Sequence, residues 1–320
     1  MSAPAAADSR MWATMSGQSA ALAQLIAEPG PVAAVSERLA GRRVLVIGTG
    51  TSWHAAAQGA ALLRRSGTTA SAAQSVDVAT EAALLDDVDV VVAMTHTGAK
   101  RFTAEAITLA GERGLDVVRI SGLDAAEADL RTVPKETSAA YTASHLAALL
   151  RHAQLAEALG ADLGSLADIP KVVQAAVDTS PSVTPPERLI ELIGAGINQW
   201  TAAEGALKIR EAAYVATEGL SVEQFLHGPS VALRANDHLV CLDGGGSQSQ
   251  RTRDIAKAAE QAGVPTTTIM NHDLSEPLSI FPLTAAVQRI ALDAAGSLGT
   301  NPDTFGRDVP GREPWKTVTL

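Results

Sequence analysis

The spacing of hydrophobic residues divides the chain into alternating strand-like and helix-like segments. Strands are predicted at residues 42–48, 88–94, 115–121, 189–196, 237–244 and 264–270, and the first of them is a continuous apolar run that ends in glycine. Runs of this length are typical of strands buried on both faces of a parallel sheet. Helices are predicted from about 51 to 65 and at 102–114, 198–217, 247–262 and 283–297. The alternation predicts an α/β fold with doubly wound parallel sheets flanked by helices.

The two halves of the chain resemble each other. A shift of 146 residues places Ile47-Gly48-x-Gly50 on Ile193-Gly194-x-Gly196, and residues 56–60 on 202–206. With a further slip of two residues, 88–98 lies over 236–246. Chance similarity in an Ala-rich chain is the alternative, but glycines matching in register favour a duplication.

The repeat sets the expected domain boundaries. Residues 1–175 are expected to hold N-terminal helices, at 9–39, packed on a first domain. A Pro/Ser-rich linker at 176–188 leads into a second domain at 189–300. The tail, 301–320, lacks periodicity, and we expect it to lie on the surface or return to the active site.

Composition and charge narrow the classes of function. The net charge of −10 and the absence of a Lys/Arg run argue against nucleic acid or an anionic membrane as a partner. No run of about 18 apolar residues predicts a membrane span. The single cysteine, Cys241, forms no internal disulfide and indicates a cytoplasmic setting. The seven scattered histidines show no metal-ligand spacing, so no metal or other cofactor is expected.

The glycine-rich turn after the first predicted strand differs from a dinucleotide-binding loop. Such a loop needs a third glycine, where this chain has Trp53, and an acidic residue about 20 positions later. Residues 67–75 contain no Asp or Glu. The sequence therefore argues against NAD or FAD.

Two hydroxyl-rich turns follow predicted strands and favour a compact anion such as phosphate. One opens a helix at 49–52, and the other is the stretch Thr-His-Thr-Gly at 95–98. Helix N-termini attract anions, and ligands of open α/β sheets bind at the carboxyl ends of strands. Simple helix capping by Thr51 or Ser52 is the alternative. The candidate anion ligands are Gly50, Thr51, Ser52, Thr95, His96, Thr97 and Lys100.

The second half lacks these hydroxyls and carries a charged helix instead. Glu204, Lys208 and Glu211 are spaced i, i+4 and i+7, which places them on one face. A solvated ion pair is one interpretation. The helix is otherwise apolar, however, and charges on a buried helix usually line a site. His227 follows in a tight loop, in "FLHGP".

These motifs together resemble the sugar isomerase (SIS) family. The similarity lies in "IGTGTSWHA", "MTHTG", "KETSAAYTAS", "EGALKIREAAYVATEGLSVEQFLHGP" and the terminal "KTVTL". It is strongest to the isomerase half of glucosamine-6-phosphate synthases and to amino-sugar-phosphate deaminases. The resemblance implies two tandem SIS domains. We expect no glutaminase activity, because the chain begins with Met-Ser and shows no cysteine nucleophile there.

The resemblance also implies roles for individual residues. The two hydroxyl-rich turns would bind phosphate, and Glu136 and Ala139 would lie at the sugar. Glu211 would move hydrogen between sugar C1 and C2, with Lys208 beside it. His227 would open the sugar ring from a second subunit, which implies a homodimer. Lys316 would engage the open-chain carbonyl.

Departures from the family pattern leave the substrate open. The usual Ser-x-Ser-Gly-Glu-Thr turn reads Thr-His-Thr-Gly-Ala-Lys at 95–100, and Tyr141 replaces a small hydroxyl residue. The leading hypothesis is a sugar-phosphate isomerase or an amino-sugar-phosphate deaminase. Ala99 and Lys100 raise a sulfonated or otherwise non-phosphorylated anionic hexose as an alternative. A non-catalytic sugar-phosphate sensor is another, although no DNA-binding extension accompanies the motifs.

Overall fold

The computed structural model describes residues 6–307, 309–312, 314–315 and 318 as two compact units. The first-sheet unit consists of Ala20–Glu136 and Ala143–Ala167. The second-sheet unit consists of the chain up to Ser19, Thr137–Thr142 and the chain from Asp168 onward. Helix α1 (Arg10–Ala27) is divided between the units.

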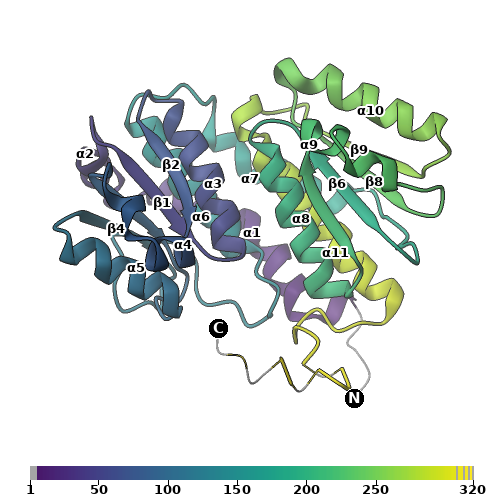
Figure 1. Ribbon diagram of the computed structural model, residues 1–320, viewed down its shortest axis with the longest axis horizontal. Helices are drawn as coiled ribbons and strands as arrows, with labels where there is room; N and C mark the ends of the chain where they lie inside the picture. The colour runs from purple at the N-terminus through teal and green to yellow at the C-terminus, as the bar shows by residue number, and fades with distance from the viewer. Residues whose placement is uncertain (1–5, 308, 313, 316–317, 319–320) are drawn as a thin grey trace. The chain divides into compact units, whose positions relative to one another are not determined.

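In the first-sheet unit, helices flank a parallel sheet (Figure 1). This sheet has five strands in the order β2-β1-β3-β4-β5. Its strands are β1 (Val44–Gly48), β2 (Ala70–Gln74), β3 (Val90–Met94), β4 (Asp116–Ser121) and β5 (Leu130–Arg131). Its helices are α2 (Val32–Leu39), α3 (Thr51–Arg64), α4 (Ser75–Thr80), α5 (Arg101–Glu112) and α6 (Ala143–Ala158). Helices α3 and α6 pack together, as do α4 and α5. Apolar residues of α4 and α5 form one cluster with alternate residues of β1 and β3.

The second-sheet unit repeats this plan with four parallel strands, in the order β7-β6-β8-β9. Its strands are β6 (Ile190–Gly194), β7 (Thr217–Ser221), β8 (His238–Asp243) and β9 (Thr266–Met270). Its helices are α7 (Ile169–Thr179), α8 (Asn198–Ala213), α9 (Val222–Leu226), α10 (Ser249–Gln261) and α11 (Ile280–Leu298). Short 3-10 turns occur at Ala6–Asp8, Ala82–Leu85, Leu166–Asp168, Pro229–Ala232, Gly246–Gln248 and Glu276–Ser279.

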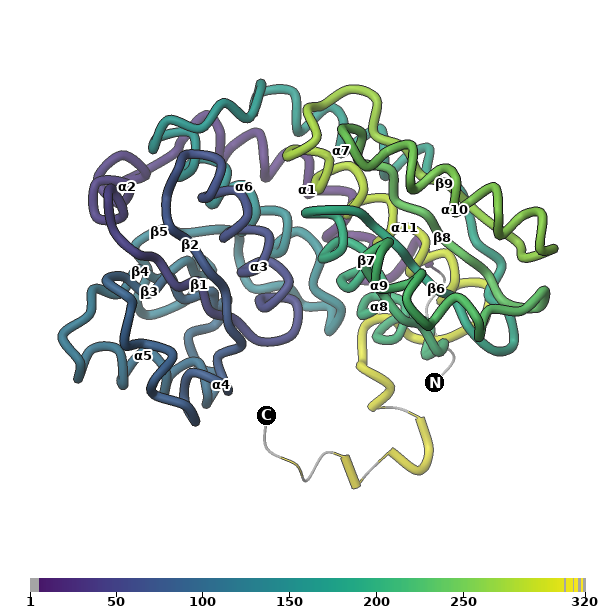
Figure 2. The backbone as a smooth tube through the Cα atoms, turned by 45° about the horizontal axis from the view of Figure 1, so that its top comes forward, coloured from purple at the N-terminus to yellow at the C-terminus, as the bar shows by residue number. Residues whose placement is uncertain are grey.

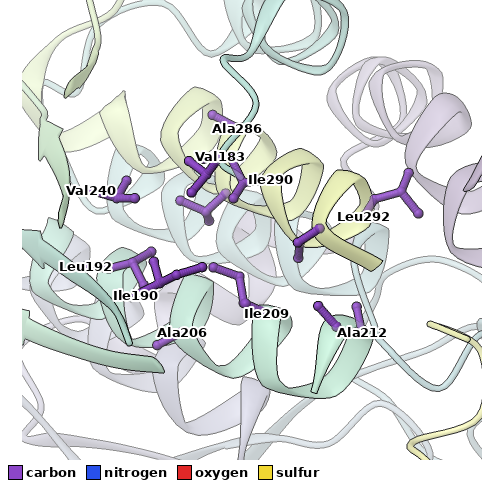
Figure 3. Packing of buried hydrophobic residues seen from close by; sticks show 14 of the residues in the cluster. Val183, Ile190, Leu192, Ala206, Ile209, Ala212, Val240, Ala286, Ile290 and Leu292 are labelled. Carbon is purple, nitrogen blue, oxygen red and sulfur yellow. The ribbon is translucent and has the colours of Figure 1, made fainter. Parts of the chain in front are cut away.

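Each face of the second sheet has its own apolar core. Helices α8 and α11 lie side by side (Figure 2), and their apolar residues pack on Ile190 and Leu192 of β6 (Figure 3). Ile193, the next residue of β6, points to the opposite core, which α9 and α10 cover. A strand with both faces buried needs apolar residues on both, which explains why the sequence pattern located it although Glu191 interrupts the run.

The turns after β1 and β6 share a backbone constraint. A Cβ at Gly48 would lie 2.2 Å from the carbonyl oxygen of Ser52, and a Cβ at Gly194 would lie 2.2 Å from that of Asn198. Gly50 and Gly196 both adopt positive φ, at 59° and 56°. Glycine is therefore required at these turns, where the following helix begins close to the strand end.

Two expectations from the sequence differ from the structure. Met11 and Met15 of α1 pack in the core of the second sheet rather than on the first domain, because their apolar partners come from α8 and α11. The sequence predicts no membrane span, whereas Glu276–Leu298 is long and apolar enough for one. The protein buries 89% of the apolar window of that helix, so its hydrophobicity is accounted for by core packing.

Helix α3 depends on a second glycine, at its contact with α6. A Cβ at Gly59 would lie 2.5 Å from the ring of His152, which is completely buried. Nε2 of His152 lies 3.0 Å from the sulfur of Met94, at the end of β3. Burial lowers the pKa of His152 to about 4, so the ring is neutral near pH 7.

We expect Gly59→Ala to destabilise the protein by about 1–3 kcal/mol, because the new methyl group overpacks the helix contact. Gly17→Ala is the control, since nothing lies within 4 Å of a Cβ at that exposed helical position. There, alanine should stabilise by about 0.5–1 kcal/mol. Urea denaturation measures both changes. Equal effects of the two substitutions would show that the contact between Gly59 and His152 is not tight.

Glu191 of β6 is a buried carboxyl group on the face that α10 covers. Its side chain is 2% exposed, and its Oε1 atom has no hydrogen-bond partner among the described residues. Burial raises its pKa to about 7, with smaller contributions from Glu218 and Asp237, while Arg188 opposes the shift. The folded protein therefore keeps this proton at pH values where the unfolded chain has released it.

The free energy of unfolding should consequently fall as pH rises from about 4.5 to about 7. Glu191→Gln removes this dependence, so between pH 5 and pH 8 its stability should rise relative to wild type by about 2 kcal/mol. Glu218→Gln, at an exposed position on the adjacent strand, is the control and should keep most of the slope. Parallel pH profiles for wild type and Glu191→Gln would contradict the assignment.

Candidate functional site

The first group of predicted site residues lies at the carboxyl edge of the first sheet. Strands β1 and β3 are adjacent and parallel, with Ile47 opposite Ala93. The turns that follow them, at 49–52 and 95–100, therefore leave the same edge of the sheet from neighbouring strands. This is the arrangement in which open α/β sheets bind ligands.

The turn after β1 places two hydroxyls in the first turn of a helix. The N-cap of α3 is Gly50, which has no side chain, and Thr51 is the first helical residue. Thr51 and Ser52 are half-buried there. Neither of them occupies the N-cap, and both lie at a helix N-terminus, where the helix dipole favours negative charge.

The turn after β3 is shaped by its own threonines. The Thr95 hydroxyl, on a buried residue, accepts a hydrogen bond of 3.1 Å from the backbone N–H of Gly98. The Thr97 hydroxyl accepts one of 3.3 Å from the N–H of Ala99. A hydroxyl that accepts from the backbone still carries a proton to donate. Lys100 is the exposed N-cap of α5 and adds positive charge.

His96 faces the next strand of the sheet. Its carbonyl accepts a hydrogen bond of 2.9 Å from the N–H of Gly122, and a Cβ at Gly122 would lie 2.8 Å from the imidazole Cε1. Burial lowers the pKa of the ring, while nearby Glu136 and a hydrogen bond to the backbone of Pro134 act in the opposite direction. We call the turns at 49–52 and 95–100 the candidate anion turns. The histidine thus links the second of these anion turns to the segment that carries Glu136.

Glu136 and Ala139 lie three residues apart but belong to different units. Glu136 is buried, and its Oε1 accepts a hydrogen bond of 2.8 Å from the N–H of Ser144, at the start of α6. Ala139 donates its N–H to the carbonyl of Asp303, 3.3 Å away, within the second-sheet unit.

The second group of predicted site residues lies on α8 and forms a buried ion-pair row. The Lys208 side chain is 1% exposed, and Glu204 and Glu211 are 0% and 10% exposed. Lys208 Nζ lies 3.5 Å from Glu204 Oε1 and forms a second ion pair with Glu211 Oε2. The expected burial of this helix is confirmed, and Glu211 is the member of the row with exposed surface.

Of the other predicted catalytic residues, His227 pairs with Glu223 rather than with this row. The His227 side chain, just after α9, is 80% exposed and lies 3.6 Å from Glu223 Oε2. Lys316 lies outside the described residues. The anion turns belong to the first-sheet unit and the ion-pair row to the second-sheet unit.

The edge of the second sheet that corresponds to the anion turns carries carboxylates. Asp243, at the end of β8, is buried and accepts hydrogen bonds from Gly245 N–H and Ser249 Oγ, at 3.0 and 2.7 Å. Arg253 pairs with it at 2.9 Å. The Glu276 side chain lies close to Gly246. Two acidic groups, Asp243 and Glu276, therefore lie at this edge together with the cation of Arg253. Among the described residues no cluster of three His, Cys, Asp or Glu could hold a metal.

Sequence reasoning missed one group around the end of α8. The Tyr214 hydroxyl and the segment Asn301–Gly306 are joined by hydrogen bonds. The tail has no periodicity, so no pattern in the sequence could have paired residues almost 90 positions apart.

Comparisons with known proteins agree with the geometry. Residues 40–158 match the model of the SIS domain family, and the resemblance read from the sequence is confirmed. Glutamine–fructose-6-phosphate aminotransferase [isomerizing] of Pyrococcus horikoshii is 28% identical, over 82% of this chain and 50% of its own length. The Thermococcus kodakarensis protein of that name is 26% identical over 85% and 52%. The chain therefore spans about half the length of these relatives.

Solved structures share the fold at low sequence identity. Glucosamine-6-phosphate deaminase from Thermotoga maritima superposes with a TM-score of 0.77 at 17% identity, covering 92% of this chain and 97% of its own. Tagatose-6-phosphate ketose/aldose isomerase from Escherichia coli gives 0.76 at 19% identity, covering 95% and 97%.

The ion-pair row should be sensitive to loss of its cation. Lys208→Met keeps the volume but removes the cation that pairs with the buried carboxylates of Glu204 and Glu211, so the free energy of unfolding should fall by about 3–5 kcal/mol at pH 8. Lys257→Met, at an exposed position on α10, is the control and should change stability by less than about 0.5 kcal/mol. Chemical denaturation measures both. Wild-type stability of Lys208→Met would contradict the buried row.

Proposed function

We propose that the protein is an enzyme that transfers a proton between C1 and C2 of a phosphorylated sugar, as an aldose–ketose isomerase or an amino-sugar-phosphate deaminase. The observation that carries this proposal is the row Glu204–Lys208–Glu211 on α8, a buried charge arrangement with one partly exposed carboxylate. Buried charges are costly, and they are commonly retained where chemistry uses them.

The proposal includes two tandem SIS domains. The strand order β2-β1-β3-β4 recurs as β7-β6-β8-β9. The glycines of the two corresponding turns meet the same backbone constraint at positions 146 residues apart. These observations support a duplicated domain in which the second copy follows the plan of residues 40–158.

In this proposal the first domain anchors the phosphate. Thr51, Ser52, Thr95 and Thr97 would donate hydroxyl protons to phosphate oxygens, and the N-terminus of α3 and Lys100 would supply positive potential. The carboxylates Asp243 and Glu276 at the corresponding edge of the second sheet support this assignment of the anion to the first domain.

The second domain would carry the proton transfer. Ring opening moves the proton of the C1 hydroxyl to the ring oxygen and exposes the C1 aldehyde. The Glu211 carboxylate then takes the C2 proton, giving an enediolate. The proton of the C2 hydroxyl passes to the C1 oxygen and Glu211 returns its proton to C1, which leaves a ketone at C2. Lys208 would fix the carboxylate of Glu211. With an amino group at C2, the same transfer gives an imine, which one water molecule hydrolyses to a ketose and ammonia.

Ring opening is assigned to His227 of a second copy of the chain. Its 80% exposed side chain, on a loop next to the exposed Val231, supports a role outside its own subunit. The tail lysine, Lys316, would engage the open-chain carbonyl. The isomerising aminotransferases that share half their length with this chain, and the ketose/aldose isomerase and deaminase of similar fold, support a reaction of this class.

Glu211→Gln should lower kcat by at least about 100-fold, because an amide cannot accept the C2 proton. Affinity for the 6-phosphate substrate should stay within about twofold, since the anion turns are unchanged.

A panel of hexose and hexosamine 6-phosphates, followed by NMR for products and by an ammonia assay, identifies the substrate and separates isomerisation from deamination.

Arg210→Gln, at the exposed neighbouring position on α8, is the matched control and should retain turnover. Full activity of Glu211→Gln would reject this carboxylate as the base. Binding of sugar phosphates without turnover by the wild-type protein would favour a sensor instead.

A further inference from the structure

Two residues other than glycine have a left-handed backbone among the described residues, and both lie in one cluster. Tyr214, at the C-cap of α8, has φ of 60°, and Phe305 has φ of 58°. Each such conformation costs about 1 kcal/mol or more and persists only where surrounding contacts enforce it. The contacts around Tyr214 therefore enforce this backbone conformation.

The Tyr214 hydroxyl binds the segment Asn301–Gly306 at two points. It donates to the carbonyl of Asn301 at 2.8 Å and accepts from the N–H of Gly306 at 2.9 Å. The preceding residue, Thr300, donates its hydroxyl proton to the carbonyl of Ala212 at 2.8 Å. This segment is thus fastened to the last turn of α8.

The same segment holds the turn at Ser138–Ala139. The Ser138 hydroxyl donates to the carbonyl of Pro302 at 3.4 Å, and Ala139 N–H donates to the carbonyl of Asp303 at 3.3 Å. Asp303 is buried, and its carboxylate accepts the N–H groups of Arg10 and Met11 at 2.9 and 3.0 Å, at the start of α1. The segment is therefore hydrogen-bonded to α8, to the Ser138–Ala139 turn and to the start of α1, all within the second-sheet unit.

We propose that Tyr214 is a positioning residue whose hydroxyl, through Asn301–Gly306, fixes the Ser138–Ala139 turn relative to α8. Glu211 lies three residues before Tyr214 on that helix. The link therefore fixes the position of the Ser138–Ala139 turn relative to the carboxylate of Glu211. This inference rests on the proposed function, in which Ala139 lies at the sugar and Glu211 is the base.

In this proposal the Tyr214 hydroxyl sets the position of the Ser138–Ala139 turn rather than the stability of the fold. Proton transfer requires donor and acceptor within hydrogen-bond reach, and a displacement of about 1 Å can cost about 100-fold in rate. Hydrogen bonds from one hydroxyl to two points of an irregular segment define its position more closely than apolar contact does. Removing the hydroxyl leaves the aromatic ring, its contact with Arg312 and the core in place.

Tyr214→Phe tests the proposal, with Ser19→Ala as the matched control. Ser19 donates its hydroxyl proton to the carbonyl of Pro170 at 2.7 Å, so the control also deletes a long-range side chain–backbone bond in the same unit. For each protein we would measure Tm, kcat and KM with the active hexose 6-phosphate, and amide exchange by mass spectrometry.

Tyr214→Phe should lower kcat by 10- to 100-fold with KM within about twofold, because the anion turns lie in the other unit. Amide exchange should accelerate both at 301–306 and at 137–142. Ser19→Ala should keep kcat within about twofold and leave exchange at 137–142 unchanged. Asp303→Asn, which weakens the attachment of the segment to α1, should shift exchange at the same peptides.

Two results would overturn the proposal. One is a kcat for Tyr214→Phe equal to that of Ser19→Ala, even with a lower Tm, which would leave the hydroxyl a purely structural role. The other is unchanged exchange at 137–142 in Tyr214→Phe, which would show that the hydroxyl does not hold the turn. If wild type converts no sugar phosphate, the proposed function fails, and the exchange result alone decides whether Tyr214 positions the turn.

Discussion

A lysine ammonium buried between two carboxylates on one helix is the interaction on which the second half of the molecule depends. Lys208 is among the largest completely buried side chains, and Glu204 has no exposed surface. Removing either charge from water is costly unless its partner stays within a few ångströms. The backbone of α8 must therefore hold the three side chains together, and Gly205, whose Cβ would meet Leu192 and Val287, lets this helix pack closely on β6 and α11.

The sequence located the elements that are buried on both faces. Strands β1, β3, β6 and β8 lie within the predicted strand segments. In a parallel sheet with helices on both faces, a strand buries both of its faces, so its residues are largely apolar and do not alternate with polar ones. Strands β2 and β7 carry Ser, Gln, Thr and Glu at the sheet edges and escaped that pattern. Helix α8 ends at Ala213, four residues before the predicted end, because Tyr214 leaves the helix with a left-handed backbone.

The candidate site was predictable where a local motif carries the chemistry. The i, i+4, i+7 spacing placed Glu204, Lys208 and Glu211 on one face, and apolar neighbours indicated their burial. Contacts between segments that are distant along the chain correspond to no motif or spacing in the sequence. The bonds from Tyr214 to Asn301 and Gly306, and from Asp303 to α1, depend on tertiary packing and on backbone groups, which every residue shares.

In the proposed tandem arrangement, the two sheets would carry different parts of the reaction. Both sheets have glycines that let a helix start against a strand, so both offer a helix N-terminus at a sheet edge. At the first sheet the turns carry hydroxyls and Lys100, whereas at the second Asp243 binds its own loop and Arg253. A carboxylate that is already bound by its own loop and by an arginine offers no donor to a phosphate. The second sheet would therefore leave the phosphate to the first and carry the proton transfer on α8, where Lys208 offsets the charges of Glu204 and Glu211 and so lowers the cost of burying them.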